Sequence, residues 1–212
     1  MGFFDHLLRD IRSVIDRDGG QNAIPPLDGA LSPNDRLDTA VPIGEPLPGV
    51  DDVIAAALLL KPRLEALGFS PFVKTTGGKG LHVVAPLLSG ARDRVTWKEA
   101  KGFAQGICQW MAQDAPERYL INMSKAKRTG KIFLDYLRND RLSTAVAVLS
   151  PRARAGATVS MPLTWAQVRG DLDPKKYTVR SVPALLAKTK AWDGYEDAAS
   201  SIKAAMKKLA TR

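Results

Sequence analysis

The sequence predicts one α/β (α+β) domain, a mixed sheet flanked by helices. Its 212 residues are 45% apolar and 25% charged, the composition of a folded domain rather than a disordered chain. Segments with the apolar alternation of strands are interspersed with segments that have the longer period of helices. The length suits one domain with a small appendage.

The first fifty residues differ from the rest. Apolar residues recur at three- and four-residue steps over 3–15, which predicts an amphipathic helix. Residues 19–50 contain five Gly and six Pro with little periodicity, which is typical of an irregular arm. The predicted organisation is therefore an arm over 1–50 and a domain over 51–212.

The middle of the chain predicts two helices around a hairpin. Asp51 and Asp52 begin a helix over 53–67, because carboxylates meet the free N–H groups of the first turn. Residues 72–75 and 81–87 predict strands that are joined by a glycine-rich turn. A second helix is predicted over 97–111.

The last third predicts two more strands and a terminal helix. Residues 131–136 and 144–149 have strand character, and 165–170 predict a short helical turn. The terminal helix is expected over 193–209, with one apolar face made of Ala198, Ile202, Met206 and Leu209.

Composition excludes some classes of protein and site. The single cysteine, Cys108, rules out an internal disulfide and a Cys-based zinc site, and two histidines are too few for a His-rich cluster. The longest uncharged apolar run is eight residues, 53–60, whereas a membrane span needs roughly 20. The N-terminus has no secretory signal pattern. We therefore expect a soluble cytoplasmic protein.

Charge is unevenly distributed along the chain. Residues 1–60 carry 4 Lys and Arg against 10 Asp and Glu, a net charge of −6, whereas residues 61–212 carry 27 against 12, a net charge of +15. The basic body favours nucleic acid or another polyanion as partner. A merely soluble basic surface is the alternative.

The turn between the two central strands could bind phosphate. Its sequence is Lys-Thr-Thr-Gly-Gly-Lys-Gly-Leu-His over 74–82, and glycines expose consecutive N–H groups to a ligand. Thr76 adds a hydroxyl, Lys79 a cation and His82 an imidazole. The spacing matches neither a Walker loop nor a dinucleotide fingerprint. A glycine hairpin with a surface lysine is the alternative.

Asp135 interrupts an apolar strand. It is either a ligand for Mg²⁺ or Mn²⁺ at the edge of the sheet or a strand-end aspartate that caps a turn.

Two basic groups follow different patterns. Arg152 and Arg154 alternate, so an extended segment would direct both guanidinium groups to one side, where they suit phosphates. A solvated arginine pair is the alternative. A second group could contact a nucleic-acid backbone or form a solvated loop; it comprises Lys125, Lys127, Arg128 and Lys131.

Three long motifs, in this order, resemble the polymerase module of bacterial DNA ligase D, a branch of the archaeo-eukaryotic primase superfamily. They are FVKTTGGKGLHVVAPL (72–87), KAKRTGKIFLDYLRN (125–139) and LSPRARAGATVSMPLTWAQV (149–168), and the tail over 172–192 is similar as well. The resemblance covers about residues 50–195. It implies a primase-polymerase fold and a role in non-homologous end joining.

The resemblance also implies site residues. Thr76, within the loop of Gly77 and Lys79, and His82 would contact the incoming nucleoside triphosphate. Asp135 would be a catalytic ligand of Mn²⁺ or Mg²⁺. Arg152 and Arg154 would lie beside the nucleotide phosphates. The implied reaction is two-metal nucleotidyl transfer to DNA ends, with a Ku-type protein and a separate ligase as partners.

The sequence departs from the family pattern in two respects. The family's N-terminal portion is missing, and so is its Asp-x-Asp pair, which resides just upstream of the helix that begins near residue 51. The nearest carboxylates are Asp38 and Glu45, which are seven residues apart and cannot share one face of a strand as an Asp-x-Asp pair does. The Asp171-Leu172-Asp173-Pro174 stretch lies after the third motif, so we do not assign the metal site there.

Two functions are consistent with these features. One is a DNA-repair primase-polymerase, which needs replacement carboxylates. The other is a catalytically degenerate module that still binds nucleotide or DNA phosphates.

Overall fold

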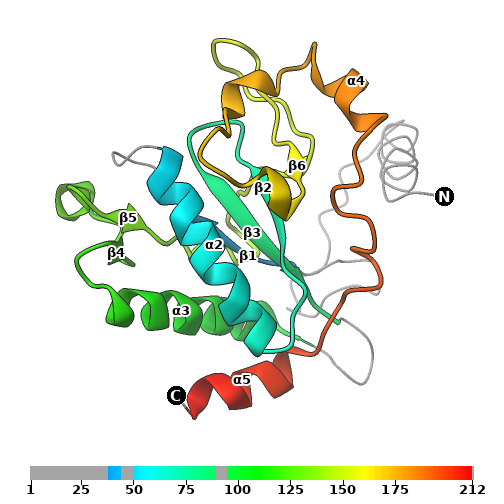
Figure 1. The fold of residues 1–212 in the computed structure, drawn as a ribbon. Helices are drawn as coiled ribbons and strands as arrows, with labels where there is room; N and C mark the ends of the chain where they lie inside the picture. The colour runs from blue at the N-terminus through cyan, green and yellow to red at the C-terminus, as the bar shows by residue number, and fades with distance from the viewer. Residues whose placement is uncertain (1–37, 44–49, 89–94, 212) are drawn as a thin grey trace, which may run out of the picture.

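A computed structural model describes residues 38–43, 50–88 and 95–211. An antiparallel four-stranded sheet lies at its centre, in the order β1–β3–β2–β6 (Figure 1). Two very short parallel strands, β4 and β5, form a second sheet beside it. The strand bounds are β1 Asp38–Ile43, β2 Phe72–Thr75, β3 Leu81–Pro86, β4 Tyr119–Leu120, β5 Ile132–Phe133 and β6 Pro162–Leu163.

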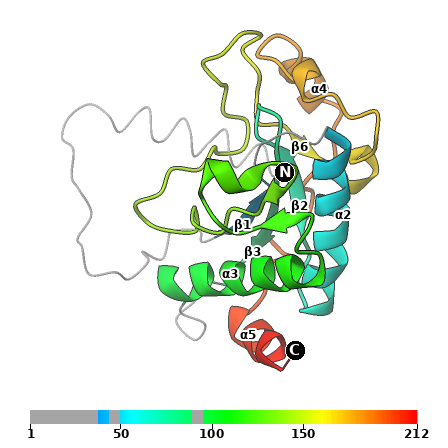
Figure 2. The same cartoon turned by 90° about the vertical axis from the view of Figure 1, so that its left-hand side faces the viewer.

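Helices α2 (Val50–Ala66) and α3 (Trp97–Asp114) pack on the sheet (Figures 1 and 2). Helix α3 begins at a capping box, in which the Thr96 hydroxyl accepts from the Glu99 N–H and the Glu99 carboxylate accepts from the Thr96 N–H. Their buried side chains form the main core with alternate strand residues, including Val73, Leu81 and Val83. The alternation of strands therefore leaves Lys74 and His82 on the opposite face of the sheet.

A smaller aromatic cluster covers part of that opposite face. Trp192 stacks on Tyr195 with ring centroids 4.8 Å apart, and both contact Phe72. The Trp192 indole N–H donates to the Val73 carbonyl at 2.9 Å. This segment ties the C-terminal part of the chain to β2 and leaves the Lys74–His82 end of the face for the site.

The mixed α/β fold and the two central helices and strands are confirmed. The expectation that the arm is irregular up to residue 50 is wrong over residues 38–43, which form strand β1. Residues 38–43 pair along the whole of β3, with Pro42 opposite His82 and Ile43 opposite Leu81. The strand was missed because prolines and glycines surround it and hide its pattern. The predicted helix over 3–15 lies outside the described residues.

The predicted strand over 144–149 is also wrong. Its carbonyls accept hydrogen bonds from side chains instead of a neighbouring strand: Val146 O accepts from Lys74 Nζ at 2.6 Å, and Thr144 O accepts from Arg138 Nη1 at 2.6 Å. The strand over 131–136 shortens to β5. Residues 144–149 are therefore a loop held by the basic residues of the site.

The terminal helix is shorter than predicted. Helix α5 spans Ile202–Ala210, because Gly194 has a left-handed φ of +77° and the Ser200 N–H donates to the Pro86 carbonyl. The sequence analysis also missed helix α4 (Val182–Leu186) and two 3₁₀ turns, Lys125–Arg128 and Pro174–Lys176. The 3₁₀ turn Trp165–Gln167 falls where a helical turn was expected. Within the described ranges, no helix is long and apolar enough to cross a membrane.

Candidate nucleotide-binding site

The glycine loop, residues 76–80, is held by residues 149–160. These residues form a narrow hairpin in which the Arg152 N–H donates to Thr158 O. The Thr158 hydroxyl donates to the Gly77 carbonyl, and the Ser160 hydroxyl donates to the Thr75 carbonyl at 2.7 Å. The loop is therefore fixed before any ligand binds.

Arg152 lies against the glycine loop. Its Nη1 donates to the Thr76 carbonyl at 3.1 Å. Gly77 has a φ of +66°, and a Cβ there would lie 2.6 Å from Arg152 Cγ. Glycine at 77 thus serves both the turn and the close approach of the arginine. The Thr76 hydroxyl donates to Gly80 O and accepts from the Gly78 N–H, while the Lys79 side chain is exposed.

His82 is the buried centre of the site. Its side chain lies on β3 directly opposite Lys74 on β2. Burial holds the pKa of the imidazole well below its ordinary value, and nearby positive charges lower it further, those of Lys74, Arg138 and Arg152. His82 is therefore neutral at pH 7, and it can donate or accept a hydrogen bond but adds no charge.

Three positive charges act on His82, and we call them the cation cluster: Lys74, which lies opposite it across the strands, Arg138 and Arg152. Lys74 is buried, with 5% of its surface exposed, and its Nζ also donates to Ser160 Oγ at 3.0 Å. The sequence analysis did not assign Lys74 or Arg138 to the site. The available signal for Lys74 was a lysine within a strand otherwise suited to burial, which indicates a charge that needs partners.

Asp135 is buried and follows β5. Its Oδ1 accepts from the Leu137 N–H at 3.0 Å, and its Oδ2 accepts from Arg138 Nε at 2.8 Å. The structure thus gives it both a turn-capping contact and an ion pair. Arg138 belongs to the cation cluster, so Asp135 lies at the edge of the same site.

These residues do not fit a centre of two divalent cations. Such a centre needs several carboxylates that converge, and within the described ranges no three His, Cys, Asp or Glu residues are grouped to hold a metal. In β1, Asp38, Ala40 and Pro42 occupy the positions that share the face of His82. Asp38 lies opposite Pro86, four residues and about 13 Å along the strand from Pro42. Glu45 lies outside the described residues.

The expected alignment of Arg152 and Arg154 is wrong in its geometry. The chain bends at Ala153, where the Arg154 N–H donates to the Arg152 carbonyl at 2.8 Å. Arg152 is half-buried against the glycine loop, whereas Arg154 is exposed at the tip of the hairpin. An extended segment would have placed them alike. The two aspartates of the 171–174 stretch have local partners, Arg169 for Asp171 and the Lys175 N–H for Asp173.

The second basic group forms a loop between β4 and β5. Arg128 lies 4.1 Å from the Phe133 ring centroid and its Nη2 donates to Met123 O, while Lys131 Nζ donates to Pro116 O. The Lys127 side chain is exposed. Lys125 begins the 3₁₀ turn. Part of this group thus shapes the loop, and Lys127 remains directed to solvent.

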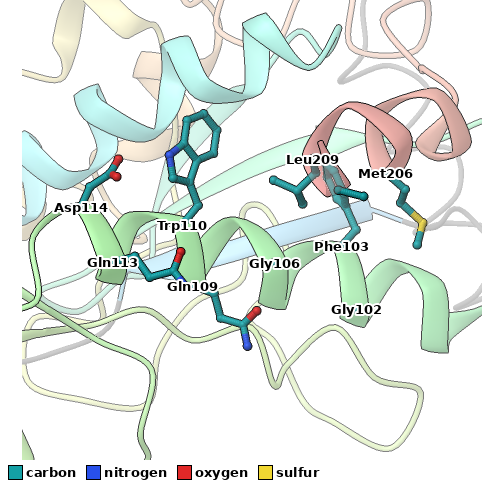
Figure 3. Close-up of a pocket in the computed structure, with 10 residues that line it drawn as sticks. Gly102, Phe103, Gly106, Gln109, Trp110, Gln113, Asp114, Met206 and Leu209 are labelled. Carbon is teal, nitrogen blue, oxygen red and sulfur yellow. The ribbon is translucent and has the colours of Figure 1, made fainter. Parts of the chain in front are cut away.

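A large pocket lies elsewhere, between α3 and α5. Figure 3 shows Phe103 on α3 beside Met206 and Leu209 on α5, with Trp110 farther along α3. Its volume is about 520 Å³, and it contains none of the residues around His82. Its lining is apolar and amide in character with one carboxylate, Asp114, and it contains no lysine or arginine. The candidate for binding a phosphorylated ligand is therefore the His82 site.

Comparison with known proteins assigns the family. The LigD primase-polymerase domain matches residues 43–192, which covers both the glycine loop and the 149–160 hairpin. The chain belongs to the LigD primase-polymerase family. Within this family it is similar to the multifunctional end-joining protein LigD of Pseudomonas aeruginosa, with 38% identity over 159 residues, and to the bifunctional LigD of Bacillus subtilis, with 30% over 138 residues.

Coverage and a solved structure extend the comparison. The two LigD alignments cover 74% and 64% of this chain but only 18% and 22% of those proteins. The polymerase domain of Mycobacterium tuberculosis ligase D, solved in complex with DNA, is similar in structure with a TM-score of 0.68 and 27% identity. That similarity covers 83% of this chain and 59% of the other. This LigD-family chain therefore spans about a fifth of the length of each of these two curated relatives.

Replacement of two glycines tests the contact between the loop and Arg152. Gly77→Ala and Gly130→Ala both place a side chain at positive φ, +66° and +71°, but a Cβ at 130 meets nothing within 4 Å. We expect each to lose about 1–2 kcal/mol from backbone strain and Gly77→Ala to lose a further 1–3 kcal/mol or so from crowding. Urea unfolding measures both, and equal losses would contradict the predicted contact.

The buried His82 predicts a loss of stability in acid. Its folded pKa is below 6.5, so below pH 6.5 the unfolded state binds a proton that the folded state does not. Stability should therefore fall as the pH drops from 6.5 towards the folded pKa, by at most about 1.4 kcal/mol per pH unit. Urea unfolding of the wild type and His82→Gln over this range checks it. The variant should lose this part of the slope, and parallel profiles would refute it.

Proposed function

We propose that the chain is a nucleotide- and DNA-end-binding module that acts in non-homologous end joining. The observation that carries the proposal is the cation cluster around neutral His82, next to a glycine loop that is already fixed. Three cations against one paired carboxylate give the site a net positive charge, which suits a polyanion. The LigD names of the similar proteins support the end-joining context.

The triphosphate of a nucleotide is the ligand that this chemistry fits. Arg152 offers a planar fork for phosphate oxygens, and the loop offers the Gly77 backbone with the exposed Lys79 beside it. We propose Thr76 and Arg154 as further contacts, the latter from the hairpin tip. Neutral His82 can form a hydrogen bond with the ligand. It does so without adding a second buried charge beside that of Lys74, which would be costly.

We propose that DNA binds through the β4–β5 loop. Lys125 and Lys127 would meet backbone phosphates, while Arg128 and Lys131 shape the loop and extend the positive surface. The similarity to a ligase D polymerase domain solved with DNA supports this assignment. A Ku-type protein and a separate ligase remain the proposed protein partners.

Removal of the Arg152 guanidinium tests nucleotide binding. Charged hydrogen bonds contribute about 1.5–3 kcal/mol, so Arg152→Ala should weaken ATP binding by about 10- to 100-fold. Isothermal titration calorimetry of wild type and variant measures the change. Arg180→Ala is the control, because Arg180 is exposed and is not among the charges that act on His82. Equal ATP affinity in wild type and Arg152→Ala would rule out this phosphate contact.

Nucleotide addition to DNA ends is the second candidate function. It is favoured by the buried Asp135, which would be a ligand of Mn²⁺ or Mg²⁺ in that activity, and by the family. It requires carboxylates that the described residues do not bring together, so we place it second.

Primer extension separates the two functions. Purified protein is given a 3′-recessed DNA end, Mn²⁺ and ribo- or deoxyribonucleoside triphosphates. We expect no extension by the wild type, while ATP binding persists. Extension by the wild type that is lost in Asp135→Ala would instead establish the polymerase and direct attention to Asp38 and Glu45 as replacement ligands.

A further inference from the structure

The ion pair of Asp135 has a consequence for metal use. Arg138 approaches Oδ2 of the carboxylate through Nε at 2.8 Å, and its Nη1 donates to Thr144 O at 2.6 Å. The guanidinium is therefore held by a backbone contact as well as by the carboxylate. Within the described ranges its Nη2 has no hydrogen bond, and the side chain is 51% exposed. Arg138 can thus bind Asp135 and a phosphate oxygen at the same time.

The Arg138 guanidinium already supplies, beside Asp135, the kind of positive charge that a divalent cation would bring to this carboxylate. The other oxygen of the carboxylate is engaged by the Leu137 N–H. Arg138 is also one of three positive charges that act on His82, the others being Lys74 and Arg152. Like charges repel, so this region disfavours an added cation. The same field attracts a polyanion.

We propose that Arg138 takes the place of a divalent cation beside Asp135, so that this site binds triphosphates without metal. Asp135 is then a positioning residue that holds the guanidinium towards the ligand. The inference rests on the proposed nucleotide binding. It adds that Arg138 supplies the positive charge that a metal ion would otherwise supply to the phosphates.

The first experiment compares ATP binding in excess EDTA and in Mn²⁺. Inorganic tripolyphosphate is a second probe, because the cation cluster recognises the phosphates rather than the base. Calorimetry should give the wild type equal or tighter binding in EDTA, since Mn²⁺ neutralises part of the charge on the phosphates. Binding that is at least tenfold tighter with Mn²⁺ would overturn the inference and leave the proposed function intact. Failure to bind either probe in both conditions would overturn both.

Arg138 variants identify the counter-charge. Arg138→Ala should weaken binding about tenfold in EDTA, and Arg138→Lys should recover part of it, because lysine keeps the charge but loses the fork. Arg169→Ala is the matched control. Arg169 forms the same type of pair with Asp171, Nε to Oδ1 at 2.7 Å, but is exposed and is not among the charges that act on His82. Equal losses in Arg138→Ala and Arg169→Ala would overturn the role of Arg138.

A gain of metal dependence separates this role from a structural one. Without Arg138, the Asp135 carboxylate is exposed to ions, so ATP binding by Arg138→Ala should become tighter on addition of Mn²⁺. The double variant Asp135→Asn with Arg138→Ala should lose that response. A variant that merely distorts the loop would show no new response to Mn²⁺, and that result would contradict the inference.

Discussion

The site depends on the hydrogen bonds between β2 with its glycine loop and the 149–160 hairpin. Thr75 is fully buried, and its hydroxyl donates to Val159 O and accepts from the Met161 N–H. These two hydrogen bonds attach the end of the hairpin to Thr75, the last residue of β2, which directly precedes the glycine loop. Because Arg152 belongs to the hairpin and His82 to β3, these bonds fix the distance between the two halves of the site.

Burial of charge sets the second constraint. A buried ammonium group is costly unless it is hydrogen-bonded, and Lys74 satisfies this with a backbone carbonyl and the Ser160 hydroxyl. Its partner across the strands, His82, remains neutral. The pair therefore adds one positive charge to the site rather than two. The loop over 144–149 also contributes to this, because its carbonyls accept hydrogen bonds from Lys74 and Arg138 instead of pairing with a strand.

The sequence predicted what depends on local pattern. Helix α3 has a cap and a clear apolar face, and the hairpin of β2 and β3 has alternating strands around glycines. Contacts between distant segments could not be predicted. Nothing near residue 138 in sequence shows that its charge acts on His82, and Gly194 with the Ser200–Pro86 contact ends the expected helix through tertiary structure. The resemblance over 149–168 proposed Arg152 and Arg154 as site residues but did not show the bend at Ala153 that separates them.

Strand β1 shows how the fold can persist while its chemistry changes. Its pairing with β3 uses backbone groups, so the sheet places little restriction on its side chains, and Pro42 is tolerated because β1 is an edge strand. A metal centre makes a stricter demand, since it requires several carboxylates that converge. The strand therefore meets the requirements of the LigD primase-polymerase fold without those of a two-metal centre. Function follows from the side chains that the fold presents, and here the charges that act on His82 are positive.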